Sequence, residues 1–221
     1  MKQPIRPNMS YLNCFQKALH TLLDAALKQH QNQTTGGNEG RKAVLEKVTQ
    51  RLAVNHVIQP EVGAENPLAD LLPELALTTR TFPESLHALA EGVLGLADQL
   101  PWYHRPVANN PIFMKNHINA QIMGPEGLVV RDDLIVGVTL MRPNVDYPDH
   151  QHEPEELYLV LSQGLWRQEN GPWGTPGLGG LVYNPSNVFH GMKSVDAPLF
   201  ALWCLPLDKA FTSFSAPLPT A

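Results

Sequence analysis

Two imidazoles, a carboxylate and a phenol recur at even spacings in one short stretch, YPDHQHEPEELYLVLSQG, at residues 147–164. They are His150, His152, Glu156 and Tyr158. Alternate residues of an extended strand point to the same face, so a strand through this stretch would project all four side chains to one side. Imidazole nitrogens and carboxylate oxygens are the usual protein ligands of borderline divalent metals. The spacing therefore predicts a metal site.

A further histidine, His190 in NPSNVFHGM, supplies another ligand from a second strand-like region. Three histidines and one glutamate would hold a metal and leave positions open for a substrate. The alternative interpretation is an ordinary polar surface, and we prefer it for the other six histidines, His20, His30, His56, His87, His104 and His117. For residues 147–164 the agreement of spacing and strand pattern favours the metal.

Composition limits the class of protein. The chain has 221 residues, is 43% hydrophobic and carries a net charge of -5, which suits one globular unit with room for an appended subdomain. No basic run, no apolar run of about 20 residues and no secretory signal pattern is visible, so we expect no nucleic-acid or membrane partner. Two cysteines, Cys14 and Cys204, read as free thiols, and we expect a cytoplasmic protein.

The elements change in character near Pro101. Apolar residues at three- and four-residue spacings predict helices over 10–30, 41–53, 68–77 and 85–100. Short apolar runs between turn residues then predict strands over 120–123, 128–131, 134–141, 157–161, 165–168, 180–183, 188–193 and 199–205. We expect a helical region, 1–105, packed on a β-barrel or sandwich, 106–221, with the helices also able to form a homodimer interface.

The metal residues lie in a pattern that resembles the two motifs of the cupin superfamily. The first motif is HxH, three or four residues, Glu, an apolar run and Gly, and it matches His150, His152, Glu156 and Gly164. The second matches in order at Gly179, Pro185 and His190.

Two positions depart from these motifs. Seven residues rather than six separate Glu156 from Gly164, and Asn187 stands where many cupins have glycine. Asparagine tolerates the left-handed conformation that such a turn needs. The resemblance implies a mainly β fold, a cupin (double-stranded β-helix or jelly-roll) barrel with an α-helical N-terminal extension.

Within the cupins, HxHxxxExY preceded by Tyr147 resembles the dimethylsulfoniopropionate (DMSP) lyases of marine bacteria, which cleave DMSP to acrylate and dimethyl sulfide with a divalent metal. The resemblance implies three core ligands, His152, Glu156 and His190. His150 would be a fourth ligand or an outer group. Tyr158 would be the catalytic base and Tyr147 a substrate-positioning residue. The metal would be Fe, Zn, Mn, Co or Ni, all of which accept this donor set.

The sulfonium end of such a substrate would need aromatic faces, because a cation without an N–H donor binds best to them. Trp203 and Tyr147 are the nearest candidates, and Tyr183 and Trp173 are two more. Trp173 lies in a Gly/Pro-rich loop, 171–180, that would be a lid or an exposed turn. Two other functions stay open, another metallo-cupin enzyme (a dioxygenase or sugar isomerase) and a non-catalytic small-molecule-binding cupin.

Overall fold

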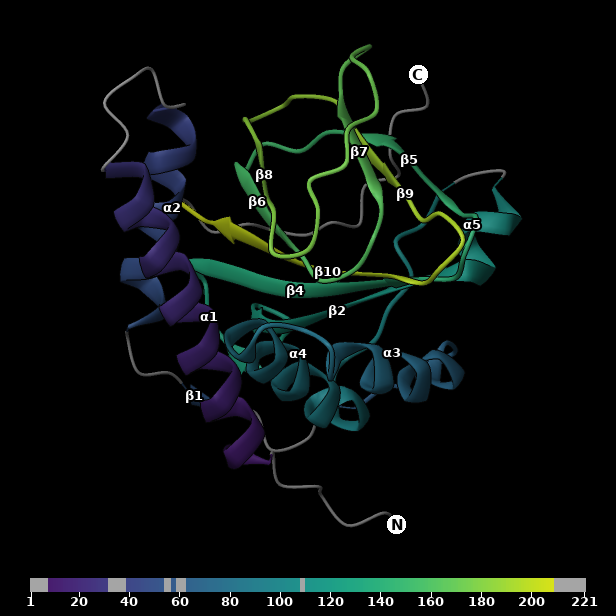
Figure 1. The fold of residues 1–221 in the computed structure, drawn as a ribbon, viewed down its shortest axis with the longest axis horizontal. Coiled ribbons are helices and arrows are strands. Elements are labelled where there is room, and N and C mark those ends of the chain that lie inside the picture. The colour runs from purple at the N-terminus through teal and green to yellow at the C-terminus, as the bar shows by residue number, and fades with distance from the viewer. Residues whose placement is uncertain (1–7, 32–38, 54–56, 59–62, 108–109, 209–221) are drawn as a thin grey trace.

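The protein folds into two β-sheets that face each other, with helices covering the outer side of the larger one (Figure 1). The computed structural model describes residues 8–31, 39–53, 57–58, 63–107 and 110–208. The larger sheet has the order β1-β3-β2-β4-β10-β6-β8, and the smaller has the order β5-β9-β7. Together they form the cupin barrel that the two motifs predict.

The strands follow the predicted apolar runs closely. Their bounds are β1 Val57–Ile58, β2 His117–Gly124, β3 Val129–Val130, β4 Leu134–Met141, β5 Asp146–His150, β6 Glu156–Val160, β7 Leu165–Gln168, β8 Leu181–Asn184, β9 His190–Lys193 and β10 Leu199–Pro206. Neither β1 nor β5 was predicted from the sequence.

The helices precede the main barrel strands, as expected. One short helix, α5, lies directly before β2 and was not predicted. Their bounds are α1 Met9–Gln31, α2 Glu39–Leu52, the 3₁₀ turn η1 Ala69–Leu71, α3 Leu72–Thr79, α4 Glu84–Leu96, the 3₁₀ turn η2 Ala97–Gln99 and α5 Pro111–Asn116. None of the helices in the described residues is long and apolar enough to cross a membrane. Both cysteines are free, Cys204 buried and Cys14 half-buried.

The central strands are apolar on both faces because each face is buried against a different partner. In β4 the side chains of Val136 and Val138 belong to the cluster that contains the helices, whereas Ile135 and Met141 belong to the barrel interior. Strand β10 alternates in the same way. Burial on both faces explains why these strands read as continuous apolar runs rather than as alternating patterns.

Residues 147–164 do not form one continuous strand. Strand β5 ends at His150 in the smaller sheet, and β6 begins at Glu156 in the larger sheet. A loop with Pro154 joins them, and proline has no N–H to donate to a ladder. The metal candidates therefore meet because the two sheets face each other, and not because of alternation along one strand.

Candidate metal centre and active site

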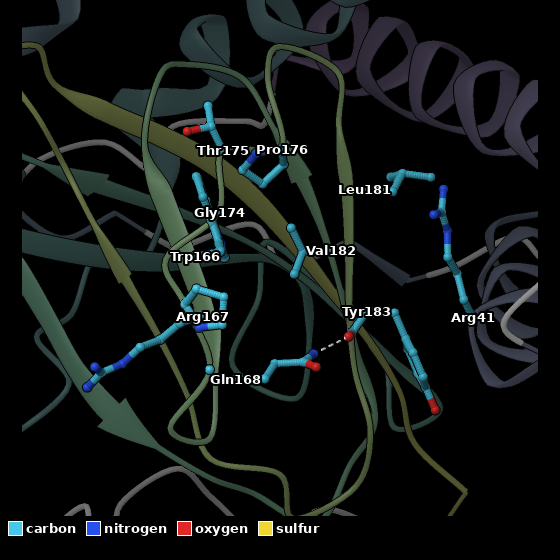
Figure 2. A pocket seen from close by; sticks show the side chains of 12 residues that line it. Arg41, Trp166, Arg167, Gln168, Gly174, Thr175, Pro176, Leu181, Val182 and Tyr183 are labelled. Atoms are coloured by element: carbon cyan, nitrogen blue, oxygen red, sulfur yellow. Dashed lines mark hydrogen bonds between the residues drawn. The ribbon is translucent and has the colours of Figure 1, made fainter.

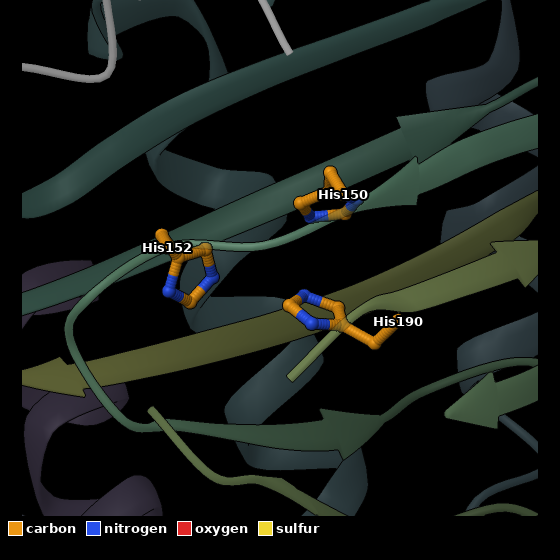
Figure 3. A group of neighbouring side chains, drawn as sticks. All are labelled: His150, His152 and His190. Carbon is orange, nitrogen blue, oxygen red and sulfur yellow. The ribbon is translucent and has the colours of Figure 1, made fainter. Parts of the chain in front are cut away.

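The three histidines of the motifs converge between the two sheets. His150, at the end of β5, pairs in register with His190, at the start of β9, and their ring centroids lie 4.2 Å apart. His152 approaches from the loop after β5, with its ring centroid 5.1 Å from that of His190. One ligand nitrogen from each histidine lies within 4.8 Å of the others (Figure 3). Sequence and structure thus select the same three imidazoles.

A tight turn joins the two motifs. Asn187 adopts a left-handed conformation, with φ of 59°, as expected for a position where glycine is common. Its backbone N–H donates to the carbonyl of His152, 2.8 Å away. The turn after β8 therefore fixes the loop that carries His152 against the strand that carries His190.

Backbone carbonyls determine which imidazole nitrogen faces the centre. Each Nδ1 lies beside one of them: His150 2.9 Å from Pro148, His152 2.8 Å from Pro154, and His190 2.9 Å from Val188. A carbonyl can only accept, so each Nδ1 carries a proton. The Nε2 atoms are therefore free of that proton and can bind a metal or a second proton. Histidines that bind metals commonly donate their other ring N–H to a carbonyl in this way.

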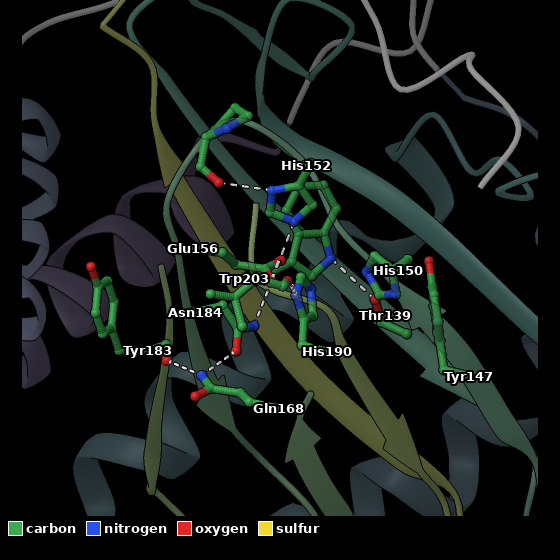
Figure 4. A network of polar contacts seen from close by, with 12 residues as sticks. Thr139, Tyr147, His150, His152, Glu156, Gln168, Tyr183, Asn184, His190 and Trp203 are labelled. Atoms are coloured by element: carbon green, nitrogen blue, oxygen red, sulfur yellow. Dashed lines mark hydrogen bonds and ion pairs between the residues drawn. The ribbon is translucent and has the colours of Figure 1, made fainter. Parts of the chain in front are cut away.

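Glu156 supplies the carboxylate of the group. Its Oε2 lies 3.1 Å from Nε2 of His190 and 3.5 Å from Nε2 of His152 (Figure 4). The Asn184 amide donates to the same oxygen at 3.0 Å. Burial raises the pKa of Glu156, but hydrogen bonds with His152 and His190 outweigh that effect and place the pKa well below its ordinary value. Glu156 is therefore an anion in a buried site.

This donor set fits a divalent metal. Nε2 of His190 is buried without a hydrogen bond of good geometry, although a carboxylate oxygen lies 3.1 Å away. Ligand atoms about 2.0–2.1 Å from an ion at tetrahedral angles lie roughly 3.3 Å from one another, which is close to the two carboxylate–imidazole separations. A lone pair facing a carboxylate requires a cation between them, either a proton or a metal.

A small cavity of about 20 Å³ adjoins Glu156 inside the barrel, enough for one water molecule. Tyr158 follows Glu156 by two residues on β6 and faces the same interior, as predicted. Trp203 of β10 pairs with Tyr158 in register. The cavity is lined by Tyr103, Arg105, Asn119, Thr139, Tyr147, Glu156, Tyr158 and Trp203.

A chain of hydrogen bonds fixes the wall of this cavity. The Trp203 indole donates to the Thr139 hydroxyl at 3.1 Å, and that hydroxyl donates to the Asn119 side-chain carbonyl at 2.6 Å. The Asn119 amide in turn lies 3.5 Å from the Tyr147 hydroxyl. Three strands, β10, β4 and β2, contribute one residue each. A satisfied buried network of this kind holds each side chain in one orientation.

Burial raises the pKa of both cavity tyrosines. Tyr158 has a pKa well above 10, first because of burial and then because of the Glu156 charge, to which its hydroxyl is hydrogen-bonded. Burial also raises the pKa of Tyr147, whereas the charge of Arg105 and hydrogen bonds from Asn119 and Arg105 lower it. A phenolate in this cavity therefore requires additional positive charge nearby.

Comparison with known proteins identifies the family. The sequence model of the dimethylsulfoniopropionate lyase family matches residues 40–201, which is more than half of the chain. The chain belongs to the DMSP lyase family.

Individual relatives match over shorter regions. The DMSP lyase DddQ of Ruegeria pomeroyi is 33% identical over 92 residues, 40% of this chain and 46% of its own length. A putative DMSP lyase, DddL of Cereibacter sphaeroides, is 22% identical over 112 residues, 51% of this chain and 47% of its own length. The chain thus spans about half the length of the curated relatives it matches.

Two solved structures share the fold over most of the chain. A chain in the crystal structures of the DMSP lyases RdDddP and RnDddQII has a TM-score of 0.63 and 22% identity, covering 88% of this chain and 95% of its own. The crystal structure of DddQ from Ruegeria pomeroyi has a TM-score of 0.59 and 21% identity, covering 87% and 92%. At these identities the likeness establishes the fold, including the helical extension.

Four cavity residues of this DMSP lyase family member were not predicted from the sequence. Tyr103 and Arg105 come from the segment after η2, Asn119 from β2 and Thr139 from β4. Buried polar residues at alternate positions of β2, His117, Asn119 and Gln121, are a signal that could have indicated an interior polar face. No spacing rule connects them to the histidines, which lie in other strands.

Two of the expected substrate-binding aromatics lie elsewhere. Tyr183 pairs with Leu157 on β6, so it faces away from the barrel interior, and its hydroxyl donates to Glu155 at 2.5 Å. Trp173 lies between two cations, Arg167 and Lys193, each 4.6 Å from its ring. These contacts fix the 171–180 loop to β7 and β9, and the structure brings neither aromatic to the cavity.

A larger pocket of about 550 Å³ is lined in part by Trp166 and Val182 (Figure 2). Both side chains line the pocket and also contact the interior cluster that contains Tyr158. Gln168, which also lines the pocket, donates to the Asn184 side-chain carbonyl at 2.8 Å. Asn184 holds Glu156, so this pocket is linked to the metal candidates by two hydrogen bonds.

Proposed function

We propose that this protein is a metal-dependent DMSP lyase that cleaves dimethylsulfoniopropionate to acrylate and dimethyl sulfide by β-elimination. The observation that carries the proposal is the buried cavity lined by Tyr158 and by Glu156, whose carboxylate lies 3.1 Å from Nε2 of His190 and 3.5 Å from Nε2 of His152. Family membership supports the reaction class. The substrate and the roles of individual residues are inferred from the chemistry of this cavity.

His152, Glu156 and His190 would hold the metal, with His150 as a fourth ligand or as an outer group. When bound, a divalent metal supplies Lewis acidity that stabilises the charge developing on the substrate carboxylate as the adjacent proton is removed. The donor set accepts Fe, Zn, Mn, Co or Ni. Asn184 orients the carboxylate of Glu156 toward the imidazoles.

Tyr158 is the proposed base. Its phenolate oxygen takes the proton from the carbon next to the carboxylate, and the C–H electron pair becomes the new carbon–carbon double bond. The bond from the β-carbon to sulfur breaks at the same time. Its electron pair stays on sulfur, so dimethyl sulfide leaves as a neutral molecule. The leaving group needs no acid, which agrees with a cavity whose described lining residues include a base candidate and, besides Glu156, no carboxylic acid.

Trp203 and Tyr147 are the proposed partners of the sulfonium end. Both line the cavity, and both have aromatic faces that attract a cation, worth about 0.5–2 kcal/mol each. The hydrogen-bond chain through Thr139 and Asn119 holds the Trp203 indole and the Tyr147 hydroxyl in fixed orientations. Tyr183 and Trp173 are not part of this proposal, because they lie outside the cavity.

The test is dimethyl sulfide release from DMSP by the purified protein, measured by headspace gas chromatography. Release should disappear after chelation and return when one divalent metal is added back. Absence of dimethyl sulfide with every one of the five metals would refute the proposal. The next candidate would then be another metallo-cupin reaction, tested by oxygen consumption with the same metals.

A further inference from the structure

Gln168 is a polar residue beside the metal candidates to which the proposed mechanism gives no role. It is the last residue of β7 and pairs in register with His190, the first residue of β9. Side chains at such paired positions point to the same face of a sheet, with Cβ atoms about 4.5–5.5 Å apart. Gln168 therefore projects from a position next to a proposed metal ligand, and its amide group reaches β8 (Figure 4).

The side chain of Gln168 connects the edges of the two sheets. Among the strands that the structure describes, β7 is the last strand of the smaller sheet and β8 is the last strand of the larger one. The Gln168 amide N–H2 donates to the backbone carbonyl of Tyr183 and to the side-chain carbonyl of Asn184, the latter at 2.8 Å. One side chain thus supplies two hydrogen bonds from the smaller sheet to the larger.

The direction of each hydrogen bond along this chain is fixed from both ends. The backbone carbonyl of Tyr183 can only accept, so the part of the Gln168 amide that faces it is the N–H2. The same N–H2 donates to the Asn184 side-chain carbonyl, and the Asn184 N–H2 then faces Glu156 at 3.0 Å. A carboxylate also only accepts, so neither amide can be reversed without placing two acceptors face to face.

The chain ends on the carboxylate oxygen that faces the imidazoles. Asn184 donates to Oε2 of Glu156, and the same oxygen lies 3.1 Å from Nε2 of His190 and 3.5 Å from Nε2 of His152. Asn184 is 1% exposed and Glu156 is 3% exposed, so water does not readily replace this contact. The orientation of the carboxylate toward the imidazoles therefore depends on the orientation of the Asn184 amide.

We propose that Gln168 is a positioning residue of the metal site, which acts on Glu156 through the amide of Asn184. The inference rests on the proposed function, because Glu156 is a ligand of the metal that this function requires. Without the Gln168 donor the Asn184 amide can turn, and its carbonyl then faces the carboxylate as a second acceptor. Outer groups that orient a metal ligand in this way contribute to metal affinity although they do not touch the metal.

The test is a double-mutant cycle on metal affinity, measured by competition with a chromophoric chelator. Gln168→Leu should lower the affinity about 3- to 10-fold, the range expected for one neutral hydrogen bond. In the Asn184→Ala background the same substitution should have no further effect, because the residue through which Gln168 acts is already gone. Gln163→Leu, at an exposed position between β6 and β7, is the matched control and should leave the affinity unchanged.

A glutamine that only joins the sheet edges would give a different cycle. Its loss would lower the metal affinity equally with and without Asn184, and that additive result would overturn the inference. An affinity that Gln168→Leu leaves unchanged would overturn it as well. Circular dichroism and urea unfolding establish that each variant is folded. If Gln168→Leu does not fold, Gln168→Met, which is closer to glutamine in length, decides in both backgrounds.

The two proposals fail separately. A metal affinity that depends on Gln168 through Asn184, in a protein that releases no dimethyl sulfide, would refute the lyase and keep the positioning role. Release of dimethyl sulfide by a protein whose metal affinity is indifferent to Gln168 would keep the lyase and refute the positioning role. Release that falls in Gln168→Leu at limiting metal and recovers at excess metal would support both.

Discussion

At the scale of the residue, the site combines three imidazoles whose Nδ1 protons are fixed with a tyrosine that must lose its proton in the proposed mechanism. The carbonyls of Pro148, Pro154 and Val188 hold the Nδ1 protons of the histidines, so their Nε2 atoms are available for a metal. Burial instead keeps the Tyr158 hydroxyl protonated. Positive charge at the imidazoles would therefore both fill the site and lower the pKa of the phenol.

Tyr158→Phe removes only the proposed base. We expect the rate of dimethyl sulfide release to fall about 10²- to 10⁴-fold, the usual contribution of a positioned base, with the metal still bound. Headspace chromatography and elemental analysis measure the two quantities. Tyr11→Phe on α1 is the matched control and should keep full activity. A Tyr158→Phe protein that retains activity would show that the base is another group.

Asn184→Ala removes the amide that holds Oε2 of Glu156 at 3.0 Å. Loss of such an outer hydrogen bond typically costs about 10- to 100-fold in metal affinity, and we expect a loss in that range. Competition with a chromophoric chelator measures the affinity. Asn170→Ala, at an exposed turn after β7, is the control. Equal affinities for the two variants would mean that Glu156 needs no support from β8.

The sequence was sufficient for residues that share a motif and insufficient for residues that meet only in space. His150, His152 and Glu156 stand within seven positions, so local spacing predicts their grouping. Arg105 and Thr139 reach the same cavity from separate segments, and no local pattern links them to it. Their convergence depends on the order of the strands in the larger sheet, which sequence spacing alone does not specify.

At the scale of the element, side-chain alternation explains both a success and two misplacements. Tyr158 and Glu156 share a face of β6, so the prediction that they lie together is confirmed. Tyr183 pairs with Leu157 and takes the opposite face, against Glu155. Trp173 lies in a loop, where its position follows from the cations of β7 and β9 rather than from any periodicity.

Gly137 of β4 is required by the indole that crosses the barrel. It pairs in register with Trp203, and a Cβ added at Gly137 would lie 2.1 Å from the Trp203 ring. Gly137→Ala should displace the indole, lower the free energy of unfolding by about 1–3 kcal/mol and reduce activity. Denaturant unfolding followed by tryptophan fluorescence measures the effect.

Gly174→Ala is the matched control for that substitution. The nearest atom to a Cβ at Gly174 is 3.9 Å away, which is an ordinary contact. It should change stability by no more than a few tenths of a kcal/mol. If Gly137→Ala is equally harmless, the Trp203 indole can move away from Gly137 without loss of stability. Its position in the cavity wall is then less constrained than the contacts indicate.

At the scale of the whole molecule, the helical extension and the barrel share a core. Phe15 of α1 and Val44 of α2 belong to the same buried cluster as Val138 of β4 and Leu202 of β10. Amphipathic spacing predicts these helices, because an apolar stripe must be covered. The sequence does not specify which face of the larger sheet these helices pack against, since the central strands β4 and β10 are buried on both faces.

The buried side chain of His117, which hydrogen-bonds the Phe113 carbonyl and the Arg105 backbone N–H, should make the stability of the whole molecule dependent on pH. Burial lowers its pKa to about 4; its hydrogen bond to Phe113 raises the pKa, and the charges of His104 and Arg105 lower it further. The unfolded chain titrates near 6.5. Between these values the unfolded chain binds a proton that the folded protein does not, so the free energy of unfolding falls as the pH falls.

His117 thus contributes its full effect above pH 6.5 and loses it progressively down to pH 4, about 3 kcal/mol in total. Urea unfolding of the metal-loaded protein at several pH values measures the slope. His117→Asn should flatten it by up to the equivalent of one proton. Phe113→Leu, which removes the aromatic ring stacked on His117 but no titrating group, should lower stability and keep the slope. Equal slopes for wild type and His117→Asn would mean that other groups cause the acid sensitivity and that His117 does not titrate differently in the folded and unfolded states.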